Sequence, residues 1–437
     1  MKNPKVASPS VTALIPLLVF VITFLGVGIY KDDFYALPAP IAVVVGIVVA
    51  FLMFRSSVES KIQTLLKGCG DHKILTMCLI YLLAGAFATV TKATGSVDAI
   101  VNLGLDYIAI QYIYLGVFVI AAFLSVSTGT SVGAIVTLAP IVVGFSGQGD
   151  ISLAVLCGAL LGGSMFGDNL SVISDTTIAA TQSLDCKMSD KFKENIKIAL
   201  PAALITLVIL TFQGLDLKSN ALEEVTYVYS VVKILPYLLV ILLSVLGVNV
   251  FITLFLGIIS AGILGVFYGD FTLMESTRIA YEGFTNMTEI FLLSLLTGGL
   301  AALVEINGGI DYILNKIKVL IKNKTSAQFG IAALVSTVNM AIANNTVSII
   351  ISGPIAKTIN DEYGLTNRKT ASILDVFACI IQGVLPYGAQ VLMILSFSKG
   401  QIDYLDLIQN TWYLLILFVT TIALIGMQPL LAKKKAR

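Results

Sequence analysis

The sequence has 437 residues, of which 57% are hydrophobic and 12% charged, and its mean hydropathy is +0.94. This composition excludes a water-soluble globular domain, and the net charge of +1 offers no basis for binding nucleic acid. The single histidine, His72, and five dispersed cysteines indicate no histidine relay, zinc site or disulfide framework.

Apolar segments recur along the whole chain. Many match the roughly 20 residues that a helix needs to cross a bilayer, and the alternation typical of β-barrels is absent. We therefore predict an all-α polytopic membrane protein. The segments cover residues 11–30, 39–54, 74–94, 111–127, 131–146, 151–183, 198–213, 231–247, 249–268, 288–306, 326–343, 346–359, 370–398 and 410–432.

Two adjacent pairs of these segments have short legs and small polar tips. They cover residues 111–146, with the tip "STGTS", and residues 326–359, with the tip "ANNT". Legs of about 14 to 18 residues reach roughly 21 to 27 Å as helices, which is short of a bilayer core of about 30 Å. We interpret each pair as a re-entrant helical hairpin, whose tip must be sheltered by protein or by a water cavity.

The ten remaining segments are predicted to span the membrane. Short cytoplasmic loops are enriched in lysine and arginine, and a cytoplasmic N-terminus places most of these residues on that side. Both termini are therefore expected in the cytoplasm, with the protein in the inner (plasma) membrane. The exceptions among the 27 basic residues are Lys31, Lys92, Lys218, Lys233, Arg278 and Lys399.

The chain contains an internal repeat with an offset of about 213 residues. "GSVDAI" at Gly95 recurs as "GGIDYI" at Gly308, and the hairpins that follow end at Pro140 and Pro354. Each half has three spans, an amphipathic linker, a hairpin, a long interrupted segment and a final span. Five crossings per half predict two inverted repeats, residues 1–213 and 231–437, joined by a connector at residues 214–230. In secondary transporters of this architecture, the site lies where the repeats meet.

The long segments, residues 151–183 and 370–398, are predicted to be broken helices. The first places Asp168 and Asp175 at membrane depth, where an unpaired carboxylate costs at least about 2.5 kcal/mol. Both should therefore face a cavity, a cation or a proton. Sodium prefers hard oxygen ligands, so we predict a sodium site from carboxylates, adjacent hydroxyls and the first tip. Its residues are Asp168, Asp175, Thr176, Thr177, Thr130, Ser131 and Ser174, with Asp175 and Thr176 as direct ligands.

The second break differs from the first in its polar side chains, since amides and a phenol near Pro386 replace the hydroxyl groups. An organic substrate is therefore possible there, and two further acids are secondary candidates: Glu305, related to Lys92 by the same offset, and Asp375, which could instead pair with a cytoplasmic base. The residues predicted to bind such a substrate are Asn169, Asn344, Asn345, Thr346, Gln382, Tyr387 and Gln390.

The string "FGDNLSVISDTT", together with the hairpin tips and "GGLAALVEINGGI", resembles the NhaC family of Na+/H+ antiporters in the ion transporter superfamily. The resemblance covers nearly the whole chain. It aligns Gly167, Asp168, Ser171, Ser174, Asp175, Thr176 and Thr177 with the family pattern Gly-Asp-Lys-x-Ser-Pro-x-Ser-Asp-Thr-Thr. This chain has Asn169 and Val172 in place of the lysine and the proline of that pattern.

These observations predict a sodium-coupled secondary active transporter that works by alternating access, most simply as a Na+/H+ antiporter. The alternative is a Na+-driven symporter for an amino acid or small carboxylate. A membrane-embedded hydrolase or a channel is less well supported, so no enzyme activity is expected. Expected partners are Na+, H+, a possible small organic solute and the lipid bilayer, without an organic cofactor. The sequence leaves a homodimer, the stoichiometry and the identity of any solute open.

Overall fold

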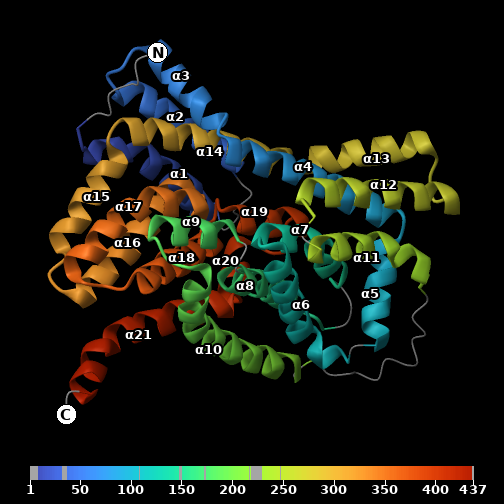
Figure 1. Ribbon diagram of the computed structural model, residues 1–437. Coiled ribbons are helices and arrows are strands. Elements are labelled where there is room, and N and C mark those ends of the chain that lie inside the picture. Colours follow the sequence, from blue (N-terminus) through green and yellow to red (C-terminus); the bar gives the residue numbers. More distant parts are fainter. Residues whose placement is uncertain are drawn as a thin grey trace.

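The structure is a computed structural model that describes residues 8–31, 37–107, 109–146, 150–171, 174–215, 217, 229–246 and 248–435 (Figure 1). These residues form helices joined by short connections, which confirms the predicted all-α class. Most of the predicted connector, residues 214–230, lies outside the described residues, as does Val172.

The first half of the chain contains ten α-helices and two short 3-10 helices in the described residues. They are η1 (Val11–Leu14), α1 (Ile15–Lys31), α2 (Ala39–Met53), α3 (Val58–Cys69), α4 (His72–Ala93), α5 (Ser96–Tyr107), η2 (Ile110–Tyr112), α6 (Ile113–Thr128), α7 (Ser131–Gly144), α8 (Leu153–Leu170), α9 (Asp175–Ser183) and α10 (Met188–Leu215).

The second half repeats this order of α-helices with one short addition, α20. Its helices are α11 (Val231–Val245), α12 (Val250–Tyr268), α13 (Leu273–Asn286), α14 (Thr288–Ile306), α15 (Gly309–Leu320), α16 (Lys324–Ile342), α17 (Asn345–Tyr363), α18 (Asn367–Val384), α19 (Ala389–Ser398), α20 (Tyr404–Gln409) and α21 (Trp412–Lys435).

Equivalent helices make reciprocal contacts across the two halves. Helix α3 packs on α14, and its counterpart α13 packs on α4. In the same way α9 packs on α17, and α19 packs on α7. In each half, the second part of the broken helix therefore packs against the hairpin of the other half.

Among the described residues, seven segments are long and apolar enough to cross a membrane. Six of them belong to the ten predicted spans, and the seventh is α16, which we had predicted as a short hairpin leg. Helices α16 and α17 have 19 residues each, about 28 Å, so leg length does not support re-entrance of the second hairpin. In the first hairpin α6 has 16 residues and α7 has 14, so that argument still applies there.

Both hairpins turn at a residue in the left-handed backbone region. These are Gly129, with φ of +70°, and Ala343, with φ of +56°. The polar residues that follow are buried: Ser131 is 1% exposed and Asn344 is 8% exposed. Protein therefore surrounds both tips, which is the shelter that a re-entrant hairpin requires.

In the structure each of the two long segments predicted to be broken is described as two helices. One break separates α8 from α9, the other separates α18 from α19, and all four helices lie in the middle of the molecule between the two hairpins (Figure 1). Small residues bring α8 close to α6: a Cβ atom on Gly163 would lie 2.3 Å from the carbonyl oxygen of Phe118. This close packing fixes the first break at the centre of the fold.

The amphipathic helices α3 and α13 were not predicted, because both lie in polar stretches that we interpreted as loops. Their start signals are visible in the sequence. Ser57 accepts a hydrogen bond from the backbone of Ser60, and Thr272 forms a capping box with Glu275. Both helices then pack along the apolar helices of the opposite half.

Candidate functional site

The candidate site centres on Asp168, which lies in the last turn of α8 and is 4% exposed. Its Oδ2 atom accepts a hydrogen bond of 2.9 Å from Ser131 at the first hairpin tip. The hydroxyl of Thr176 lies 3.5 Å from Oδ1, at the outer limit for a hydrogen bond. None of the ion pairs found among the described residues involves Asp168.

This position is electrostatically unfavourable for a carboxylate without a cation. The C-terminal end of a helix carries partial negative charge, which repels an anion in the last turn. Burial adds the cost of removing the charge from water, and two hydroxyl groups offset only part of it. The arrangement therefore favours binding of a cation or a proton at Asp168.

A chain of hydrogen bonds joins Asp168 to the second half of the molecule. The hydroxyl of Ser131 accepts a bond of 3.0 Å from Gln390 at the start of α19. Gln390 in turn accepts a bond of 3.1 Å from Gln382 on α18, which also donates to the carbonyl of Ala343 at the second tip. Both breaks and both tips thus meet in one polar network, which joins Ser131 of the predicted sodium site to Gln382 and Gln390 of the predicted substrate site.

The hydroxyls that follow Asp168 also stabilise the break itself. Ser174 caps α9 by accepting a bond from the backbone of Thr177, and its hydroxyl lies 3.0 Å from that of Thr176. Thr177 donates to the carbonyl of Ser171, the residue that follows α8. These side chains replace hydrogen bonds that the interruption removes, so they have a structural role beside any role in ion binding.

A second charged cluster lies beside the break. Asp375 on α18 is fully buried and forms an ion pair of 2.7 Å with Lys191 on α10. Asn195, one turn further along α10, donates to the same oxygen atom of Asp375 and to the carbonyl of Asn169. The side chain of Asn169 itself donates to Tyr413 on α21.

Sequence reasoning missed the role of Lys191, because this residue was counted only among the basic residues on the cytoplasmic side. In the structure its side chain is buried, with 1% exposed. The signal that could have identified it is helical spacing. Lys191 and Asn195 extend the buried face of α10 that continues through Ala199, Ala202 and Thr206.

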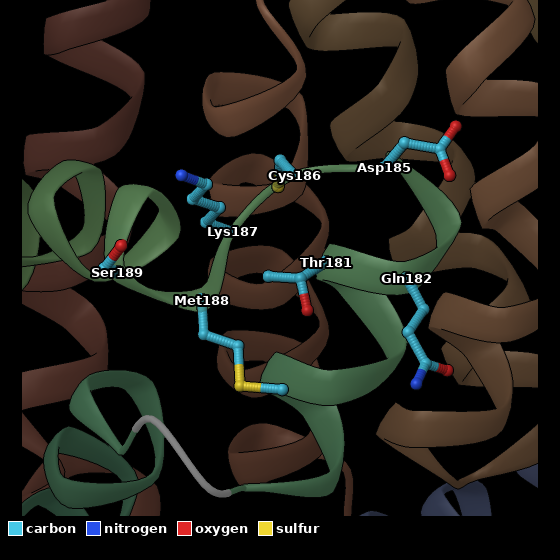
Figure 2. Close-up of a pocket in the computed structure, with 7 residues that line it drawn as sticks. All are labelled: Thr181, Gln182, Asp185, Cys186, Lys187, Met188 and Ser189. Atoms are coloured by element: carbon cyan, nitrogen blue, oxygen red, sulfur yellow. The ribbon is translucent and has the colours of Figure 1, made fainter.

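Asp175 does not share the buried site. Its side chain is exposed in the first turn of α9, where a carboxylate is favoured by the helix dipole, whereas Asp168 is buried. Gln182 lies two turns further on the same face and is also exposed. It lines an open pocket of about 550 Å³ at the connection between α9 and α10 (Figure 2).

This pocket begins one helical turn from the hydroxyls of the break. Thr181 lines it and donates a hydrogen bond of 2.7 Å to the carbonyl of Thr177. Figure 2 shows Thr181 and Gln182 on α9 and the remaining lining residues on the connection to α10 and its first turn. They are Asp185, Cys186, Lys187, Met188 and Ser189.

Most of the remaining predicted site residues make local contacts. Asn344 caps α17 by accepting a bond from Val347, and Asn345 accepts a bond from the backbone of Thr346. The hydroxyl of Tyr387 donates a bond of 2.6 Å to a carbonyl of α16. Thr130 is half-buried directly before α7.

A small cavity borders Asn344 and Tyr387. Its volume of about 20 Å³ is sufficient for roughly one water molecule. An organic substrate does not fit there in this conformation.

The two acids proposed as secondary candidates have different environments. Glu305 is exposed at the end of α14, and Lys92 is exposed at the end of α4. The ion pairs of the described residues do not include either of them, so these two equivalent positions do not form a pair across the repeats. Asp375, by contrast, lies in the centre of the fold with a lysine partner.

Comparison with known proteins identifies related transporters. The profile of the Na+/H+ antiporter family matches the chain twice in succession, over residues 6–215 and 216–428. The Na(+)/H(+) antiporter NhaC of Bacillus subtilis is 24% identical over 367 residues, which cover 77% of this chain and 80% of that protein.

Two further similarities were found. The malate-2H(+)/Na(+)-lactate antiporter of the same organism is 27% identical over 361 residues, which cover 74% of this chain and 77% of that protein. The crystal structure of the Alcanivorax borkumensis YdaH transporter aligns with 86% of this chain and 89% of its own, at 13% identity and a TM-score of 0.42.

Proposed function

Because this chain belongs to the Na+/H+ antiporter family, we propose that it exchanges sodium for protons and that Asp168 binds the two ions in turn. The observation that carries this assignment is the burial of Asp168 without a basic partner. A carboxylate in this setting is stable when a sodium ion or a proton neutralises it. Because the two ions share one carboxylate, binding of either one excludes the other.

The sodium ligands proposed around Asp168 are hydroxyl oxygens of the break and the tip. Thr176 is the first candidate, because its contact with Oδ1 is long, at 3.5 Å, and its hydroxyl oxygen can turn toward a cation. Ser131 is held by Gln390 and orients the other carboxylate oxygen. Sodium, like other hard cations, favours such oxygen ligands.

We assign Asp175 to the access route and not to the binding site. Asp175 and Gln182 form one exposed face of α9 that runs from the break toward the open pocket. A carboxylate on this path attracts cations without the cost of burial. With the orientation predicted from the basic residues, this path opens toward the cytoplasm.

The proposed architecture is a pair of inverted repeats in the inner membrane, with both termini in the cytoplasm. The repeated helix order and the two consecutive family matches support the duplication. Cys78 on α4 contacts the carbonyl of Phe291 on α14, and the two residues are separated by 213 positions, the offset of the repeat. Contacts between equivalent residues are typical of positions near a pseudo-two-fold axis.

A second candidate function is sodium-coupled transport of a small organic acid, since one relative is named a malate-2H(+)/Na(+)-lactate antiporter. The amides of Gln382 and Gln390 are linked to Asp168 through Ser131 and could bind a carboxylate group. The small cavity at the second tip favours ion exchange, because it leaves no room for lactate in this conformation.

Flux in proteoliposomes separates these functions. Purified protein is reconstituted with a pH-sensitive dye inside, and a sodium gradient is imposed without and with lactate, malate or an amino acid. Proton counterflow driven by sodium alone supports Na+/H+ exchange. Sodium-dependent uptake of the organic solute without that counterflow contradicts it and supports symport.

A further inference from the structure

The ammonium group of Lys191 occupies a cage of three oxygen atoms contributed by both halves. Its Nζ atom lies 2.7 Å from Asp375 Oδ2, 2.6 Å from Thr177 Oγ1 and 3.2 Å from the carbonyl oxygen of Asn169. We refer to these three oxygens as the oxygen cage. Asn169 and Thr177 flank the first break, whereas Asp375 comes from the second half.

The electrostatic potential at the cage is made negative by the end of a helix as well as by the one carboxylate. The carbonyl of Asn169 is one of the last in α8, where the helix dipole favours a cation. Interrupted helices bind sodium through carbonyls of this kind in other transporters.

Three further oxygens near the cage are buried and have no hydrogen-bond partner among the described residues. They are Oδ1 of Asn169, Oδ1 of Asn195 and Oδ1 of Asp375. Asn195 is bonded through its amide nitrogen to two cage atoms, Asp375 Oδ2 and the carbonyl of Asn169. The cluster thus contains more oxygen acceptors than a single lysine satisfies.

Lys191 is attached to a segment that borders the open pocket. Lys187, Met188 and Ser189 line that pocket (Figure 2). Lys191 follows within the first turn of α10. The open pocket therefore lies about one helical turn along the chain from the lysine that occupies the cage.

We propose that the oxygen cage is a second alkali-cation site, which Lys191 occupies in this conformation and which sodium takes when the ammonium is removed. Lys191 is then a tethered competitor of sodium and limits how many ions the centre holds. The proposal is separate from the assignment of Asp168, because the two sites use different carboxylates.

Equilibrium binding of radioactive sodium to purified protein tests this inference. Lys191→Ala removes the ammonium and leaves space, so we expect one more bound sodium ion per chain than in the wild type. The matched control, Lys191→Ala with Asp375→Asn, lacks the charge that would hold the ion and should return to the wild-type number. Lys191→Arg keeps the cage occupied and should also bind as the wild type does.

The extra ion must depend on the carboxylate of the cage. Unchanged stoichiometry in Lys191→Ala, or an extra ion that persists in the double variant, overturns the proposal. If Asp168 turns out not to bind sodium, the difference in bound sodium between Lys191→Ala and the double variant can still be measured. Failure of the Asp168 assignment is therefore distinguishable from failure of the oxygen cage.

A second measurement covers the case in which Lys191→Ala folds poorly, because removal of the lysine leaves Asp375 buried without a partner. The variant is prepared in parallel in sodium chloride and in choline chloride, whose cation is too large for the cage. Recovery of folded protein in sodium alone supports the proposal, since sodium then replaces the ammonium. Equal loss in both salts overturns it.

Discussion

Replacing Asp168 with asparagine removes the charge that we assign to ion exchange and changes little else. The asparagine side chain has nearly the same shape, and its oxygen atom can still accept the hydrogen bond of Ser131. Thr176 and the caps of the break are left in place. The substitution therefore isolates the electrostatic contribution of the carboxylate.

The expected loss of sodium affinity follows from Coulomb's law. Unit charges about 4 Å apart interact with about 4 kcal/mol at an effective dielectric constant of about 20, and each 1.4 kcal/mol is roughly a factor of ten in affinity. Asp168→Asn should thus weaken sodium binding by about a thousandfold. Without sodium, the variant should be no less stable than the wild type, because a buried unpaired charge has been removed.

Thermal unfolding in detergent, measured over a range of sodium concentrations, tests both expectations. A bound ion raises the melting temperature of the wild type as its concentration exceeds the dissociation constant. In Asp168→Asn this rise should disappear over the same range. The matched control is Asp175→Asn, the same change at an exposed position seven residues away, which should retain the rise.

The reasoning is refuted if Asp168→Asn keeps its sodium-dependent stabilisation with an affinity within about threefold of the wild type. It is also refuted if Asp175→Asn alone removes the stabilisation, because the buried carboxylate would then not be the sodium ligand.

Competition between protons and sodium at Asp168, the hydrogen bond of Tyr387 and the close packing of Gly163 can each be tested separately. Below the pKa of Asp168, lowering the pH by one unit should weaken sodium binding about tenfold, because one proton competes with one sodium ion. Calorimetric titrations at several pH values measure this dependence, and an affinity that does not change with pH contradicts it. Tyr387→Phe should lower stability by about 1 kcal/mol through loss of its bond to α16 while leaving sodium affinity unchanged, which thermal unfolding with and without sodium would show. Gly163→Ala should destabilise by about 1 to 3 kcal/mol because its Cβ meets the Phe118 carbonyl, whereas Gly116→Ala, where the added carbon meets nothing within 4 Å, should be neutral or stabilising in the same assay.

The elements of the fold could largely be predicted from the sequence. Apolar runs located the central helices, and the glycine and polar residues near Asp168 indicated the first break, because these features depend on local composition. The helices α3 and α13 were missed because their apolar faces are narrow and their partners lie in the opposite half. The length of α17 was also underestimated, since its last residues, 360–363, are polar and continue the helix beyond the apolar segment.

The candidate site was predicted less completely. Asp168, Ser131 and Gln390 were identified because polar residues at membrane depth are unusual wherever they occur. The burial of Lys191 and the exposure of Asp175 depend on how α10 and α9 are rotated, which a hydropathy pattern of the whole chain does not determine.

The family pattern has a lysine at the position of residue 169. This chain has Asn169 there, and the structure brings the ammonium of Lys191 from another helix to the carbonyl of that residue. The positive charge beside the break is therefore present, although it is not in the motif. A comparison restricted to contiguous residues would conclude that it is absent.

The polar contacts that cross between the halves have a consequence for the working cycle. Gln390 is bonded to Ser131, Asp375 to Lys191, and Tyr413 to Asn169. If the halves rock apart to admit water, some of these pairs separate, and Asp375 and Lys191 then lose their charged partners. An ion that arrives at that moment would compensate for the separation, so the interface between the halves would itself oppose uncoupled leakage.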